Sequence, residues 1–268
     1  MKVAVAVPSI AALAVAVPSI LVSATLPSGA VSAYDINNSL IFGSTSQFSQ
    51  ALTASDRKKW TYSGWIKRCD IDAAHYLFSG YGNATNRAHL YLEATNNLIF
   101  YNMAGGVSVV NMKTDILLKD TSAYYHIMCV YDSAQATESN RLKFYVNNDL
   151  HTPYVSGGFN IGLNEETNIN ATGTQYVGAR GDATAYNDGY MAEVHFIDGQ
   201  ALTPDDFGEV HATTGQWVAK EYEGTYGTNG FYLDFEDDTS ATTLGYDVSG
   251  NTNHFTPSGV ATTDQVID

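Results

Sequence analysis

The 268-residue sequence has few cysteines, few basic residues and no long apolar run, and each shortage argues against a class of protein. Two cysteines, Cys69 and Cys129, are too few and too far apart for a disulfide scaffold or a zinc site, and we expect both thiols to be reduced. The 13 Lys and Arg residues against 28 Asp and Glu residues give a formal net charge of −15, which argues against nucleic-acid binding, because phosphates require a basic surface. No run reaches the roughly 18 apolar residues of a membrane span, so we expect no membrane insertion.

The sequence also lacks the motifs that would indicate an enzyme. It contains no GxSxG elbow, HExxH helix or P-loop, and no E-x-D-x-x-E strand that would place two hydrolytic carboxylates on one face. Glu193 and His195 are expected to project from one face of a strand, and His126 from a neighbouring strand. This arrangement is either a general acid/base pair or, more commonly in sheets, a structural polar contact. We therefore expect a non-enzymatic protein.

The chain instead contains a dense succession of strand signals separated by turns rich in Gly, Asn, Ser and Thr. In 190–197, alternation would place Ala192, Val194 and Phe196 on one face, and Met191, Glu193, His195 and Ile197 on the other. Only 202–207 indicates a helical turn, with Thr203 as cap and Pro204 in the first position. The pattern predicts an all-β, two-sheet antiparallel sandwich. The predicted strands are 39–42, 60–67, 75–79, 89–93, 98–102, 107–112, 124–131, 142–146, 175–179, 190–197 and 231–235.

The first 33 residues differ from the rest of the chain. They carry AVAVPSI twice, at 4–10 and 14–20, and a looser copy, ATLPS, at 24–28. Pro8, Pro18 and Pro27 forbid a continuous helix. Two interpretations stay open: a secretory signal peptide that is cleaved before Tyr34, or a retained apolar arm that assembles with a neighbouring subunit. We predict an N-terminal arm over 1–33, favoured by the repeat, and a sandwich domain over 34–268.

Several segments, in their order along the chain, resemble a known family. They are WTYSGWIKR (60–68), AYYHIMCVYD (123–132), RLKFYVNN (141–148), YVGAR (176–180), YMAEVHFIDG (190–199), GTYGTNGFYLDFEDD (224–238) and DVSGNTNHFT (247–256). Together they resemble the laminin G-like, or concanavalin A-like, jelly-roll domains found in many bacteriophage proteins, especially from marine phages. The resemblance extends from about Asn38 to the C-terminus.

The resemblance implies a jelly-roll sandwich on the virion surface, such as a tail fibre, an adhesin or a capsid decoration protein. Its partners would be other virion subunits, further copies of itself, and a host-surface glycan. A secreted bacterial carbohydrate-binding protein with a cleaved signal peptide is the alternative, and a glycoside hydrolase of the same fold is a third reading.

The residues suggest two candidate sites. The loop 180–189 carries Asp182, Tyr186, Asn187 and Asp188, which combine one aromatic platform with several oxygen acceptors and are our predicted ligand-binding residues. Oxygen ligands for calcium are available at Asp234, Asp237 and Asp238, although such acids also form solvated turns. The aromatic residues that we consider for stacking against sugars are Tyr186, Tyr190, Trp217, Tyr222, Tyr226 and Tyr232.

Overall fold

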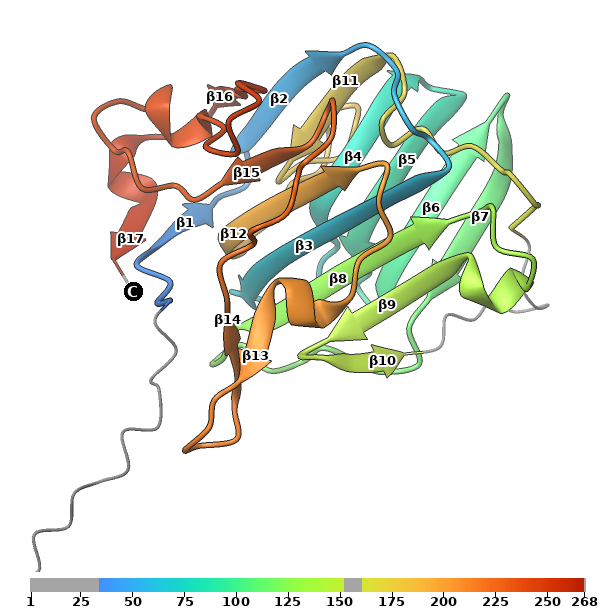
Figure 1. Cartoon of the computed structure of the whole chain (residues 1–268). Helices are drawn as coiled ribbons and strands as arrows, with labels where there is room; N and C mark the ends of the chain where they lie inside the picture. Colours follow the sequence, from blue (N-terminus) through green and yellow to red (C-terminus); the bar gives the residue numbers. More distant parts are fainter. Residues whose placement is uncertain (1–33, 152–160, 268) are drawn as a thin grey trace, which may run out of the picture.

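Two antiparallel β-sheets stack face to face in the computed structural model, which describes residues 34–151 and 161–267 (Figure 1). Sheet A has the order β10 (Asp149–His151), β9 (Leu142–Val146), β8 (Tyr125–Asp132), β3 (Lys59–Arg68), β12 (Gly189–Asp198), β1 (Asn38–Phe42) and β17 (Gln265–Ile267), and β15 (Phe231–Leu233) also pairs with β12. Sheet B has the order β16 (Thr256–Ser258), β2 (Gln47–Leu52), β11 (Gly173–Val177), β4 (His75–Asn83), β5 (Asn86–Leu92), β6 (Leu98–Ala104) and β7 (Val107–Lys113). The two-sheet antiparallel sandwich predicted from the sequence is therefore confirmed.

Alternating side chains of both sheets form the core between them. In β3, Trp60, Tyr62 and Ile66 point inward, where the Trp60 ring stacks on Tyr131 and the Tyr62 ring stacks on Phe78 of sheet B. Each fully buried aromatic side chain contributes on the order of 2–3 kcal/mol by leaving water. Because successive residues of a strand face opposite sides, Ser63 and Trp65 of β3 lie on the outer face of sheet A.

A β-bulge in β12 changes the expected alternation of that strand. Glu193 has a φ of 50°, and the register against β3 shifts between Ala192 and His195. The extra residue moves Met191 into the core with Val194 and Phe196, and leaves Ala192 outside with Trp65. The predicted faces were therefore wrong for Met191 and Ala192, and correct for the residues after the bulge.

The segment 199–230 folds over the outer face of sheet A. It begins with a 3-10 turn, η2 (Pro204–Asp206), in which the carboxylate of Asp206 accepts hydrogen bonds from the backbone N–H and the hydroxyl of Thr203, so the predicted helical turn is confirmed. The segment continues as a hairpin of β13 (Gly208–Val210) and β14 (Trp217–Ala219), which stands out from the sandwich in Figure 1. Phe207 and Tyr226 of this segment pack on Met128 and Val130, which explains why β8 is apolar on both faces.

The remaining described elements are three further 3-10 turns: η1 (Glu138–Asn140), η3 (Thr243–Gly245) and η4 (Thr262–Asp264). Cys69 is exposed and Cys129 is buried, and both are free thiols, as expected. Among the described residues there is no helix of the length and apolarity needed to cross a membrane. The predicted arm, with Pro8, Pro18 and Pro27, lies outside the described residues.

Candidate functional site

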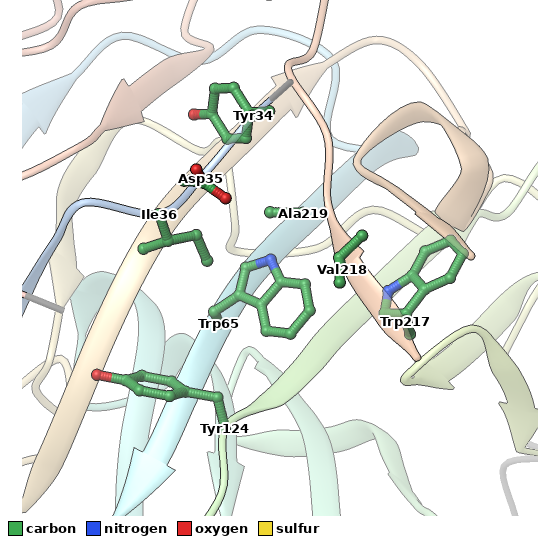
Figure 2. Close-up of a pocket in the computed structure, with 8 residues that line it drawn as sticks. All are labelled: Tyr34, Asp35, Ile36, Trp65, Tyr124, Trp217, Val218 and Ala219. Atoms are coloured by element: carbon green, nitrogen blue, oxygen red, sulfur yellow. The ribbon is translucent and has the colours of Figure 1, made fainter. Parts of the chain in front are cut away.

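Two adjoining pockets on the outer face of sheet A share Trp65, Tyr124 and Trp217, and we call them together the aromatic groove. The first has a volume of about 250 Å³ and is drawn in Figure 2, where the Trp65 ring lies between Tyr124 and the strand that carries Trp217. The second has a volume of about 550 Å³. The first is completed by Tyr34, Asp35, Ile36, Val218 and Ala219, and the second by Asn147, Asn148, Asp149, Val210, Gly215 and Gln216.

Trp65 lies in this groove because of its position in β3. It is five residues after Trp60, an odd spacing, so the two indoles project from opposite faces of the strand. Trp60 is in the core, where its Nε1–H donates to Thr167 Oγ1 at 3.0 Å, whereas Trp65 faces the groove. Trp65 is only 8% exposed, because Ala192 and Ala219 pack around it. It therefore forms a rigid aromatic floor.

Trp217 is held in place by the buried His126. Its indole Nε1–H donates to His126 Nδ1 at 3.0 Å, and the Nε2 of the same ring lies 2.8 Å from Ser63 Oγ. An indole nitrogen can only donate, so Nδ1 must be the acceptor and Nε2 carries the proton. Complete burial lowers the pKa of His126 to about 3, aided by the nearby His195, so the ring is neutral and this tautomer persists at neutral pH.

The Trp217 ring also approaches β13 closely at Gly208. A Cβ built on Gly208 would lie 2.4 Å from the six-membered ring of Trp217, closer than real side chains come. The position is therefore open only to glycine as long as the indole keeps its place. The ring centroid of His126 lies 6.0 Å from that of Trp217 and 5.0 Å from that of Trp65. Both indoles are thus packed against one imidazole.

The polar end of the groove is the turn between β9 and β10. Asn147 and Asn148 have φ angles of 50° and 75°, the left-handed pair that a two-residue hairpin turn requires and that asparagine tolerates. Asn147 Oδ1 accepts the backbone N–H of His126 at 2.8 Å, which ties the turn to β8. Asn148 and Asp149 are exposed beside the aromatic rings, so the groove combines apolar faces with hydrogen-bonding groups.

The opposite wall of the groove, Tyr34–Ile36, is fixed by Glu193. The hydroxyl of Tyr34 donates to Glu193 Oε2, and the hydroxyl of Tyr232 donates to the same oxygen at 2.8 Å. Burial alone would raise the pKa of Glu193, but the neighbouring His195 and these hydroxyls outweigh it and hold the pKa below its usual value. The positive φ of Glu193 in the bulge thus accompanies a carboxylate that lies against Tyr34 and accepts its hydrogen bond.

Glu193 and His195 belong to this packed network and not to an open site. They are 6% and 3% exposed, and His195 Nε2 lies 3.7 Å from Glu193 Oε2. The other nitrogen of His195 lies 2.9 Å from the hydroxyl of Tyr226. The rings of Tyr232 and Phe207 cover the imidazole. His126, the third residue of the suggested acid/base group, is engaged by Ser63 and Trp217. The geometry is that of the structural polar contact.

The predicted ligand loop is held largely by its own contacts. Asp182 accepts from Arg180 at 2.6 Å and from the Thr184 hydroxyl at 2.7 Å, and Tyr186 donates to the carbonyl of Ala183 at 2.6 Å. Asn187 is buried, and Asp188 is exposed with its backbone N–H bonded to His75. None of the four predicted residues lines the aromatic groove as the described residues form it. Ligand binding by this loop stays a prediction.

The acidic residues suggested for calcium are not gathered. Within residues 34–151 and 161–267, no three His, Cys, Asp or Glu side chains lie close enough together to hold a metal ion. Asp237 accepts the backbone N–H of Thr239 at 3.0 Å and its hydroxyl at 2.6 Å, and Asp234 accepts the N–H of Glu236 at 3.1 Å. Asp238 is exposed. Asp234 and Asp237 form turns of the kind weighed as the alternative, and calcium binding by these residues stays a prediction.

Of the aromatic residues considered for stacking, Trp217 lines the groove, whereas Tyr222, Tyr226 and Tyr232 pack around Phe207 and His195. The ammonium group of Lys67 lies over the ring of Tyr190, 5.5 Å from the ring centroid. Trp65 and Tyr124 were not among the residues predicted from the sequence. The odd spacing of Trp60 and Trp65 is the signal that would have found the first, since one strand cannot bury both indoles in one core.

A family model agrees with this architecture. The model described as the concanavalin A-like lectin/glucanases superfamily matches residues 42–207. This region covers most of both sheets and ends at the turn before the β13–β14 hairpin, so Trp217 lies beyond it. No curated protein matches the chain in sequence.

One solved structure shares the fold, and two others are similar to this chain, all at low sequence identity. An inferred carbohydrate-binding protein from Bacteroides ovatus matches 87% of this chain over 60% of its own length, with a TM-score of 0.54 and 15% identity. The SAP-like pentraxin of Limulus polyphemus matches 70% of this chain over 94% of its own length, with a TM-score of 0.47 and 16% identity. Domains LG4-5 of the mouse laminin alpha1 chain match 75% of this chain over 48% of their own length, with a TM-score of 0.43 and 13% identity.

Proposed function

The chain belongs to the concanavalin A-like lectin/glucanases superfamily, and we propose that it is a non-catalytic glycan-binding protein whose aromatic groove holds the sugar. One observation carries this proposal: two indoles, Trp65 and Trp217, are packed against the same buried histidine and line one groove. Aromatic rings held in this way lose no conformational freedom when a ligand binds.

The chemistry of the groove suits a neutral oligosaccharide. The C–H faces of sugar rings are flat and apolar and stack on indole and phenol rings, while their hydroxyls need hydrogen-bonding partners. Trp65, Tyr124 and Trp217 offer the first, and Asn148 and Asp149 offer the second at the same end. The two volumes, about 250 and 550 Å³, fall in or near the range of roughly 300–1,000 Å³ that small-molecule sites occupy.

The proposal of a non-catalytic role rests on burial. A glycoside hydrolase needs two carboxyl groups about 5–9.5 Å apart that both reach the scissile bond. Glu193, a buried acid, is bonded to Tyr34 of the groove wall and to Tyr232. The groove's own acids, Asp35 and Asp149, line different pockets. We therefore expect bound oligosaccharides to be recovered intact, with no release of reducing ends after prolonged incubation.

A glycan array followed by calorimetric titration tests the proposal. Trp217→Ala is expected to weaken binding of the best neutral oligosaccharide by about tenfold, which corresponds to about 1.4 kcal/mol of lost stacking. Tyr246→Ala, which removes a 40% exposed ring elsewhere, serves as the matched control and should bind as the wild type does. The double variant Tyr186→Ala with Asp188→Ala examines the other predicted site. Loss of binding in the double variant alone would place the sugar on the loop 180–189 and overturn the groove.

We further propose that this module is displayed on a bacteriophage particle and attached through residues 1–33. The support is the order of the sequence segments that resemble phage jelly-roll proteins and the apolar Pro/Ser repeat of the arm. Mass spectrometry of the protein from purified particles should then find residues 1–33 present, and a variant that lacks them should fold but fail to join particles. A mature protein that starts at Tyr34 would indicate the secreted alternative.

A further inference from the structure

A further pocket lies on the outer face of sheet B, on the other side of the sandwich from the aromatic groove. It has a volume of about 170 Å³ and is lined by Tyr76, Arg87, His89, Tyr91, Tyr101 and Arg180. The adjacent strands β4, β5 and β6 supply all four rings, and Arg180 reaches the pocket from the chain that follows β11. Neither a sequence motif nor the proposed groove accounts for these residues.

His89 is the least satisfied residue of this pocket. It is 4% exposed, and its Nδ1 lies 3.2 Å from Ser79 Oγ. Its Nε2 is buried and has no hydrogen-bond partner among the described residues. Buried polar atoms are almost always paired, so an orphan that lines a pocket points to a partner supplied from outside the chain. When the Ser79 hydroxyl donates to Nδ1, Nε2 carries the proton and offers a donor.

The charge of the pocket is opposite to that of the chain. The protein has a formal net charge of −15, yet the two charged residues that line this pocket are both arginines. One nitrogen of Arg180 donates a hydrogen bond to Asp182, and one nitrogen of Arg87 donates to the carbonyl of Ala84. A guanidinium group has five N–H donors, so both side chains keep further donors. Burial is the main cause that lowers the pKa of His89 to about 3, and the positive charges of Arg180 and Arg87 contribute to the same shift. The imidazole ring is therefore neutral, and both arginines act on it.

Tyrosine rings form the sides of the pocket. Tyr76 and Tyr91 stack with centroids 4.9 Å apart, and Tyr101 stacks with His89 at 6.1 Å. The volume of about 170 Å³ is close to the roughly 150 Å³ of an apolar cavity that takes one benzene ring in another protein. The pocket therefore has room for about one six-membered ring, with aromatic walls beside it and cationic donors around it.

We propose that this pocket binds a single acidic sugar ring, with the anionic group of the sugar held by Arg87, Arg180 and the Nε2–H of His89. Arginine forks bind carboxylates and sulfates through paired, charge-assisted hydrogen bonds, and the tyrosine rings supply a surface for the sugar ring. This site goes beyond the proposed groove, because it lies on the opposite face, selects charge and needs none of the tryptophans.

Titration of the full chain with three matched probes, glucose, glucuronate and glucose 6-sulfate, tests the site. We expect one or both anionic sugars to bind at least about tenfold more tightly than glucose, and the preferred one identifies the anionic group. Arg87→Ala and Arg180→Ala should each weaken that binding about tenfold. Lys119→Gln removes a positive charge from an exposed position outside the pocket and should leave it unchanged. Circular dichroism checks that each variant is folded.

A measurement on the wild type makes the test independent of the variants. In nitrogen-15 spectra of the imidazole rings, the acidic sugar should shift the Nε2 resonance of His89, assigned by its loss in His89→Gln, and leave that of the fully buried His126 in place. Equal affinity for glucose and the anionic sugars, or an unshifted His89 at saturation, overturns the site. Inorganic sulfate that binds as tightly as the acidic sugars overturns the assignment to a sugar. Trp217→Ala should not change this binding, so the two proposals fail separately.

Discussion

The indole Nε1 of Trp217 donates a hydrogen bond of 3.0 Å to Nδ1 of His126, and this contact joins the covering hairpin to the centre of sheet A. Trp217 comes from β14, and His126 comes from β8, which pairs with the strand of Trp65. One buried, neutral imidazole therefore sets the position of two groove rings. The proposed binding surface thus depends on His126, which is not among the residues that line either pocket.

Replacing His126 tests this dependence. His126→Leu leaves the indole N–H of Trp217 and the hydroxyl of Ser63 without their partner, so we expect the free energy of unfolding in urea to fall by about 1–3 kcal/mol. Glycan affinity should fall several-fold in addition, because Trp217 is no longer held. His126→Gln keeps an acceptor and a donor, and should recover part of the affinity. A fully active His126→Leu variant would show that the contact does not position the ring.

Acid should destabilise the protein through its buried histidines. Burial lowers the pKa of both His89 and His126 to about 3, whereas the pKa in the unfolded chain is about 6.5. Between these values the unfolded state binds protons that the folded state does not, so stability is complete above pH 6.5 and falls as the pH decreases. The loss is at most about 1.4 kcal/mol per pH unit for each histidine. Urea titrations from pH 7 to 5 should show this slope.

The His126→Gln variant is the control for that slope. It removes one of the two titrating rings, so its free energy of unfolding should depend less steeply on pH than that of the wild type. Equal slopes for the two proteins would mean that His126 does not titrate on unfolding in this range.

Gly208→Ala should weaken glycan binding although Gly208 does not line the groove. The new methyl group would lie 2.4 Å from the present position of the Trp217 ring, so the indole must move. We expect a several-fold loss of affinity in calorimetric titration and a change in tryptophan fluorescence. At Gly43 a Cβ meets only Ser46 Oγ, at 3.8 Å, so Gly43→Ala is a matched control that should change neither. Unchanged binding by Gly208→Ala would contradict the tight packing of Trp217.

Calcium chelation should have little effect. Asp234, Asp237 and Asp238 do not form a carboxylate cluster, and Asp237 is occupied with turn hydrogen bonds. We expect the melting temperature and the affinity for a neutral oligosaccharide to be the same in excess chelator and in millimolar calcium. A clear fall of the melting temperature on chelation would show that calcium binds through other oxygen ligands.

The long apolar strands of the fold were predictable from the sequence, whereas β2 and most of the three-residue strands were not. Strands such as 124–131 and 142–146 carry their own pattern of apolar residues. β13 and β14 have three residues each and exist because each pairs with the other. The bulge in β12 was hidden because nothing in the sequence marks Glu193 as a residue of positive φ. The local sequence pattern indicates which face of a strand is buried, whereas the pairing of distant strands decides which residues lie beside it.

The site was predictable only in part, for the same reason. Trp217 could be selected from the sequence as a stacking residue. The odd spacing of Trp60 and Trp65 along one strand could have identified Trp65 as a second ring outside the core. The adjacency of Trp65 to His126 requires the pairing of β3 with β8, and the meeting of Arg87 with Arg180 requires β11, β4 and β5 to be neighbours. These pairings join segments that are far apart in sequence, and no local spacing specifies them.

The indole N–H signals of the tryptophan side chains report whether a glycan binds on the indoles of the aromatic groove. The chain has three tryptophans, so a nitrogen-15 spectrum contains three indole N–H signals. On titration with the neutral oligosaccharide selected by the array, the signals of Trp65 and Trp217 should shift and saturate together. The signal of Trp60, buried in the core and bonded to Thr167, should stay in place. Saturated binding with the Trp65 and Trp217 signals unmoved would contradict the account.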